Sequence, residues 1–186
     1  GGSYAKECIV PVEELRYLRG LHRDLEGRIR LGELICNKGI SIDLLDIFRE
    51  LYEAGYPIQS IRLVDEFGAD DERSMEANNT SCFNYRTVPG KGGADRLAGG
   101  AAGKGGAERK AGRGKLSLHA YGRAVDINPL YNPYVRGIGT AAEQVMPTGS
   151  RKYLNRSGKY PYKIMPGDLC HRLFVRHGFM WGGGWR

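Results

Sequence analysis

The stretch from Ser117 to Asp126, SLHAYGRAVD, constrains the fold and chemistry of this 186-residue chain more than any other. It places His119 and Asp126 seven residues apart, with Gly122 between them. Ligands on one helical face lie about three or four residues apart, so this spacing indicates a turn in which Gly122 reverses the chain. Imidazole nitrogens and carboxylate oxygens are ordinary zinc ligands, and a carboxylate within an apolar strand needs a partner or a metal. The pattern therefore predicts a metal site at His119 and Asp126.

The stretch resembles Ser-x-His-x-x-Gly-x-Ala-x-Asp, the first metal motif of the zinc D-alanyl-D-alanine carboxypeptidases and dipeptidases. That family includes the vancomycin-resistance D,D-peptidases and the L-alanyl-D-glutamate endopeptidases, and it shares a fold with the hedgehog amino-terminal domain. Further segments are similar in the same order: SMEANNTSCFNYR at 74–86, DINP at 126–129, NPY at 132–134 and HGFMWGGGW at 177–185. The similar region extends over about residues 30–186.

The resemblance implies a zinc-dependent metallopeptidase of the bacterial cell wall that hydrolyses peptidoglycan stem peptides. The activity would be that of a D-Ala-D-Ala carboxypeptidase or a related endopeptidase. By position in the motifs, His119 and Asp126 would bind Zn²⁺, and Ser117 would bind the substrate. Arg86 would be catalytic, as the group that stabilises the oxyanion. From the sequence alone, a surface salt bridge would be the ordinary interpretation of such an arginine.

The chain departs from the family at its end. After the Trp-Gly-Gly-x-Trp segment the family carries an acid, two residues and a histidine, which are its general base and third zinc ligand; this sequence stops at Arg186. Either a continuation supplies both residues, or the chain is an inactive relative that binds cell-wall peptide or a partner without cutting it. His171 and His177 are weaker candidates for the third ligand, and His22 is weaker still.

Length and composition indicate one domain with a proper core, expected to be a monomer. We expect an N-terminal arm at 1–14 and a peptidase domain at 15–186. The domain contains a flexible insertion at 91–115, where nine glycines and six alanines cannot bury enough surface to fold. That insertion carries +5 of the net charge of +7 and no aromatic residue, so we expect no nucleic-acid partner. No apolar run approaches the roughly 20 residues of a membrane span.

Cysteine usage and the N-terminus bear on the compartment. The four cysteines form no CxxC pair, and buried free thiols are favoured over disulfides. Gly1 to Ser3 resembles the remnant of a cleaved tag, which would follow removal of an export signal. Neither feature decides the compartment, but the resemblance to peptidases of the cell wall implies an extracytoplasmic protein, in the periplasm or cell envelope.

Hydrophobic periodicity predicts the secondary structure. A helix is expected at 41–54 and another after Asp168, with a strand or hairpin within 15–37 and strands at 58–64, 80–86 and 179–181. The acidic run Asp70-Asp71-Glu72 is interpreted as a solvated loop or a local cap. The predicted fold class is α+β: a single domain whose central antiparallel sheet carries the metal site and is flanked by helices.

Overall fold

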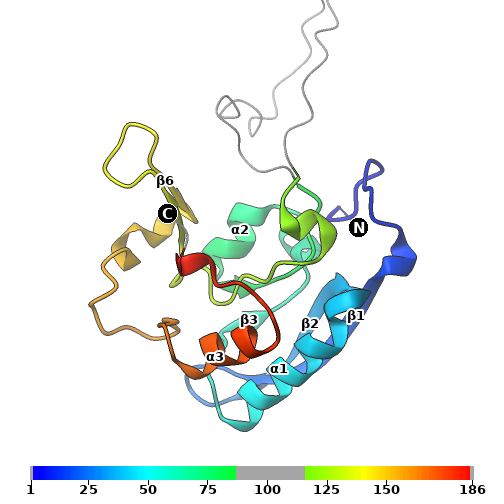
Figure 1. Ribbon diagram of the computed structural model, residues 1–186, viewed down its shortest axis with the longest axis horizontal. Helices are drawn as coiled ribbons and strands as arrows, with labels where there is room; N and C mark the ends of the chain where they lie inside the picture. The colour runs from blue at the N-terminus through cyan, green and yellow to red at the C-terminus, as the bar shows by residue number, and fades with distance from the viewer. Residues whose placement is uncertain (1, 87–115, 185–186) are drawn as a thin grey trace, which may run out of the picture.

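The computed structural model describes residues 2–86 and 116–184, shown in Figure 1. Helices and strands are mixed, which confirms the α+β class. The predicted insertion at 91–115 lies outside the described residues. In place of one central sheet, the described residues form three two-stranded sheets, β1–β2, β3–β4 and β5–β6.

The first sheet is a hairpin, one of the two alternatives expected at 15–37. β1 (Leu15–Arg23) pairs antiparallel with β2 (Ile29–Asn37) along the full length of both strands. Side chains alternate between its faces, so Leu34, Cys36 and His22 are buried on one face. The rest of the core packs against that face of the hairpin.

The long predicted helix covers this buried face of the hairpin. α1 (Ser41–Glu53) buries Leu44, Ile47 and Leu51, which are fully enclosed, and it lies along the hairpin in Figure 1. Gly55 follows it in the left-handed conformation, with φ of 67°. The second predicted helix, α3 (Leu169–Arg176), packs against α1 and begins at Asp168, whose Oδ1 accepts a hydrogen bond from the His171 amide at 2.8 Å.

The expected strands at 58–64 and 80–86 are much shorter than predicted. β3 (Ser60–Ile61) and β4 (Asn79–Thr80) pair in parallel over two residues each. The Asn79 side chain replaces the next step of the ladder, since its Oδ1 accepts from the Arg62 amide at 2.8 Å and its Nδ2 donates to the Arg62 carbonyl at 2.9 Å. Side-chain amides of this kind compete with strand pairing, which is why the sheet stops here.

The remaining elements surround this centre. α2 (Asp71–Glu76), which was not predicted, begins at Asp70, whose side chain caps the Arg73 amide at 3.1 Å. β5 (Tyr134–Arg136) and β6 (Gln144–Met146) form a small hairpin at the opposite side of the molecule from α1 (Figure 1). Residues 179–181, predicted as a strand, form none. The 3₁₀ helices are η1 (Val12–Glu14), η2 (Lys38–Ile40), η3 (Val64–Phe67), η4 (Leu118–Tyr121), η5 (Thr148–Tyr153) and η6 (Gly182–Gly184).

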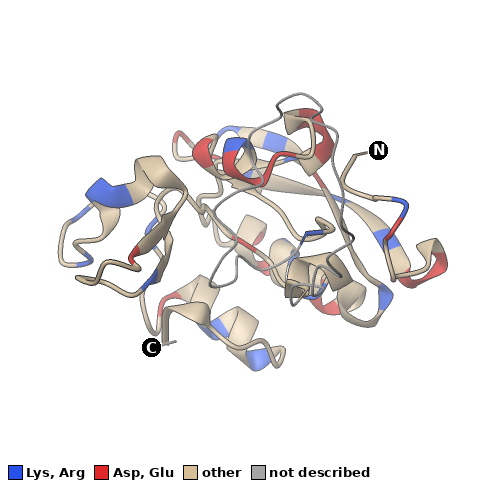
Figure 2. Cartoon of the chain, turned by 90° about the horizontal axis from the view of Figure 1, so that it is seen from above, with Lys and Arg blue, Asp and Glu red and all other residues tan. Residues whose placement is uncertain are grey.

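Two surface properties follow from the described residues. Basic and acidic residues alternate along several elements of the chain in Figure 2. No helix in the described ranges has the length and hydrophobicity needed to cross a membrane.

All four cysteines are free thiols, and Cys36, Cys82 and Cys170 are buried, as the sequence favoured.

Candidate functional site

The motif at 117–126 folds as a short 3₁₀ turn that ends at a glycine. Ser117 caps η4, because its Oγ accepts a hydrogen bond from the His119 amide at 3.3 Å. Gly122 then adopts φ of 65° and reverses the chain, as predicted. An added Cβ at Gly122 would lie 2.7 Å from the Asn37 nitrogen, so the turn lies directly against the end of β2. Glycine is therefore required here both by conformation and by space.

The turn presents a buried histidine in one defined orientation. The His119 Nδ1 atom lies 2.7 Å from the Cys82 carbonyl oxygen, which can only accept a hydrogen bond. We assign the proton of the neutral ring to Nδ1 on this basis, which leaves the lone pair on Nε2. Nε2 lies 3.2 Å from Asp126 Oδ2. The side chains predicted as metal ligands are thus brought together.

Asp126 is held by its backbone rather than by a long strand. Its amide and carbonyl both bond to Ser81, at 3.0 and 3.2 Å, as an isolated antiparallel bridge. The predicted apolar strand around Asp126 is therefore reduced to this single bridge. The bridge still fixes the carboxylate beside His119, since Cys82, the residue after Ser81, supplies the carbonyl for the imidazole.

The two side chains perturb each other electrostatically. Burial disfavours the charged form of His119, but the adjacent Asp126 carboxylate outweighs burial and raises the pKa of His119. Burial raises the pKa of the Asp126 carboxyl, but the nearby His119 and then Arg86 outweigh burial and lower that pKa. In the metal-free protein the pair is stabilised as imidazolium and carboxylate.

Arg86 lies in the same cluster, but its partner was not foreseen. Its Nε is 2.9 Å from Asp71 Oδ2, and both side chains are largely buried, with 24% and 15% exposed. Although the atoms are close, neither forms a hydrogen bond, and they are the only buried side-chain polar atoms of the described residues without one. For the acidic run, predicted to be a solvated loop or a local cap, the cap is confirmed for Asp70, whereas Asp71 is not solvated and lies inside the site.

Asp71 is connected to the histidine through Asn84. The Asn84 side chain donates to Asp71 Oδ1 at 3.2 Å, and its amide donates to the His119 carbonyl at 3.1 Å. Burial raises the pKa of Asp71; the Arg86 charge opposes this rise, and the Asp126 charge adds to it. Asp71, Arg86, His119 and Asp126 therefore form one electrostatic unit of two acidic and two basic groups.

The donor set fits part of a zinc site. His119 offers Nε2 while its other nitrogen is tied to a backbone carbonyl, which is the usual outer arrangement of a metal-binding histidine. Asp126 supplies a carboxylate oxygen on the same side. Within residues 2–86 and 116–184, however, no third His, Cys, Asp or Glu completes a metal-binding group. Zinc sites in enzymes ordinarily use about three protein ligands.

The other histidines make contacts elsewhere. His177 Nδ1 lies 2.9 Å from Asp43 Oδ1 on α1, and His171 Nδ1 accepts from the Gly167 amide at 3.1 Å. His22 Nδ1 bonds to the Ile58 carbonyl at 2.8 Å, beneath the hairpin. The structure therefore places none of these alternatives beside His119.

Comparison with known proteins supports the same family as the motif. Residues 111–186 match the family model described as D-alanyl-D-alanine carboxypeptidase, a range that includes His119 and Asp126. This match confirms the resemblance for that part of the chain. Cys82, Asn84, Arg86 and Asp71 lie before the matched range. No curated protein and no solved structure gives a significant match.

Proposed function

We propose that this chain is a zinc-dependent peptidase of the D-alanyl-D-alanine carboxypeptidase type. The observation that carries the proposal is the approach of His119 Nε2 to Asp126 Oδ2 at 3.2 Å, within the segment that matches the family. Both atoms are donors that zinc accepts, and the Cys82 carbonyl holds the imidazole in the tautomer that binding requires.

Zinc bound there would polarise the scissile carbonyl and lower the pKa of a water molecule. The residues of the chain contribute orientation and charge. Arg86 places a guanidinium beside the two donors, where it can stabilise negative charge that develops on the carbonyl oxygen of an amide. Asp71 contacts Arg86 and thereby positions it. Ser117 caps η4 by accepting a hydrogen bond at its Oγ from the His119 amide. Its hydroxyl proton can then donate a hydrogen bond to the substrate.

The substrate class is proposed from the family match. It is a peptidoglycan stem peptide with D-amino acids, cut by carboxypeptidase or endopeptidase action in the periplasm or cell envelope. No general base is assigned among the described residues, because Asp126 is a proposed metal ligand and Asp71 is paired with Arg86.

The test combines metal content with hydrolysis. After incubation with zinc and desalting, we expect about one zinc per chain in the wild type and in His171→Ala, and none in His119→Ala. The matched control removes a histidine whose ring accepts a hydrogen bond from the Gly167 amide and packs against Trp181. Release of D-alanine from a peptide ending in D-Ala-D-Ala is then measured on the zinc-loaded protein. A wild type that retains no zinc would refute the metal assignment.

A second candidate is a non-catalytic binding module for cell-wall peptide or a partner. The observation that favours it is the missing third ligand within the described ranges. It predicts that a D-Ala-D-Ala peptide binds with measurable affinity, in a calorimetric titration, while zinc loading releases no D-alanine. Hydrolysis that depends on His119 would exclude it.

A further inference from the structure

A cavity of about 530 Å³ lies away from the His119 site, at the tip of the β1–β2 hairpin. Its walls come from the hairpin, from β3, and from Tyr131 and Tyr162, and it includes none of the four residues of the proposed metal site. Its volume falls within the range of about 300–1,000 Å³ typical of small-molecule sites.

One buried carboxylate organises the wall of this cavity. Asp24 is 5% exposed and accepts three hydrogen bonds: from the Arg28 amide at 2.9 Å, from Arg28 Nε at 2.7 Å and from Arg30 Nε at 3.3 Å. Burial alone would raise the pKa of Asp24, but these bonds outweigh it and bring the pKa to about 2. The carboxylate therefore stays charged and fixes both guanidinium groups at neutral pH.

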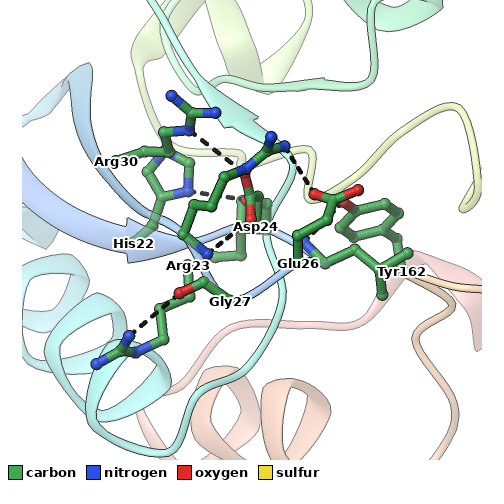
Figure 3. Close-up of polar contacts among 10 residues, drawn as sticks. His22, Arg23, Asp24, Glu26, Gly27, Arg30 and Tyr162 are labelled. Atoms are coloured by element: carbon green, nitrogen blue, oxygen red, sulfur yellow. Dashed lines mark hydrogen bonds and ion pairs between the residues drawn. The ribbon is translucent and has the colours of Figure 1, made fainter.

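These contacts leave part of the hydrogen-bonding capacity of the arginines available. Arg28 has a second partner, Glu26, through Nη2 at 2.8 Å, whereas Arg30 contacts Asp24 through Nε alone. Neither terminal nitrogen of Arg30 has a hydrogen-bond partner among the described residues. Arg62 also lines the cavity, but its guanidinium is paired with Glu66, so the unpaired guanidinium edge is that of Arg30. Figure 3 shows Asp24 between Arg30 on one side and Glu26 and Tyr162 on the other.

The rest of the lining includes aromatic and aliphatic side chains. The Tyr162 hydroxyl accepts from the Leu25 amide at 2.9 Å, which holds the ring in place and leaves its own proton to donate. Tyr131 packs against it with ring centroids 5.2 Å apart, and Leu31 and Ile61 complete this side. A lining that combines an unpaired guanidinium edge with aromatic rings suits a small molecule with an anionic group at one end.

We propose that this cavity binds a monosaccharide-sized ligand bearing a carboxylate or phosphate group, with the anion on the free edge of Arg30. A planar guanidinium with both terminal nitrogens available makes the bidentate contact that either anion prefers. The site is independent of the peptidase proposal, because the two share no residue.

The test is a calorimetric titration of the whole chain, without added zinc, with glucuronate, glucose 6-phosphate and glucose. We expect at least one of the two anionic sugars to bind and glucose to bind at least tenfold more weakly. Carboxylate and phosphate are separated by which anion binds. Failure of both anions to bind, or glucose binding as tightly as either, would overturn the proposal.

Variants locate the binding. Arg30→Gln removes the charge from a side chain that is 51% exposed, and it should raise the Kd for the anion at least tenfold. Arg30→Lys keeps the charge but loses the bidentate edge, and it should give an intermediate Kd. Arg49→Gln is the matched control, since Arg49 is 62% exposed on α1 and pairs with Asp46. Unchanged affinity in Arg30→Gln, or equal losses in Arg30→Gln and Arg49→Gln, would refute the assignment.

Discussion

Replacing Gly122 by alanine tests whether the turn between the two donors is held by close backbone contact. The residue has φ of 65°, and a Cβ would lie 2.7 Å from the Asn37 nitrogen and 3.1 Å from the Cys36 carbonyl carbon. Both neighbours are backbone atoms, so no side chain can rotate away. The Gly122 carbonyl also accepts the Asn37 amide at 2.9 Å, which ties the same two segments together.

The expected loss has two parts. A non-glycine residue in the left-handed region costs about 1–2 kcal/mol. Forcing extra volume into a packed site costs about 1–3 kcal/mol. The sum is about 2–5 kcal/mol, and each kcal/mol lowers the melting temperature by about 2–4 °C in a domain of this size.

Gly55→Ala supplies the matched control. Gly55 has φ of 67°, almost the same as Gly122, but an added Cβ there meets no atom within 4 Å. It should therefore lose only the conformational part, about 1–2 kcal/mol. Urea denaturation of the two variants gives the comparison. Because Gly122→Ala must displace His119 relative to β2, it should also weaken zinc binding, whereas Gly55→Ala should leave it unchanged. Equal losses of stability in the two variants would show that the close approach to Asn37 carries no energy.

The remaining predictions concern charge. Arg86→Ala should lower the rate of amide hydrolysis by about 10²–10³ while zinc content stays the same, because the guanidinium stabilises charge and binds no metal; an unchanged rate in a chain that is active would refute the role. Burial lowers the pKa of His22 from 6.5, so the unfolded chain binds more protons below that pH and stability should fall as pH drops through about 6.5. His22→Asn, which can keep a donor toward the Ile58 carbonyl, should lose this dependence in urea melts at successive pH values; the same slope in both proteins would contradict it.

The features that were predictable from the sequence are those that local patterns determine. α1 followed from its apolar stripe and from Gly55, and the hairpin followed from alternation along 15–37. The pairing of His119 with Asp126 followed from the glycine between them. Each of these depends on neighbours within one or two segments, where periodicity and turn chemistry carry the information.

The features that were missed depend on tertiary context. The strands at 58–64 and 80–86 were overestimated, since the Asn79 side chain takes the place of strand pairing. Asp71 looked like a solvated acid because it follows another aspartate, and only packing beside Arg86 buries it. The signal that could have found it is Asp70, since a capping residue begins a helix and turns the next side chain away from the cap.

The site is assembled from two parts of the chain, and the family match covers one of them. The matched range supplies the donor side chains of His119 and Asp126. Their geometry is set from outside it: the Cys82 carbonyl selects the tautomer of the imidazole, and Ser81 holds the backbone of Asp126. The charges beside them, on Arg86 and Asp71, also precede the match. The chemistry proposed for this protein therefore depends on residues 71–86 as much as on the motif, since two correct donors without fixed orientation bind a metal weakly.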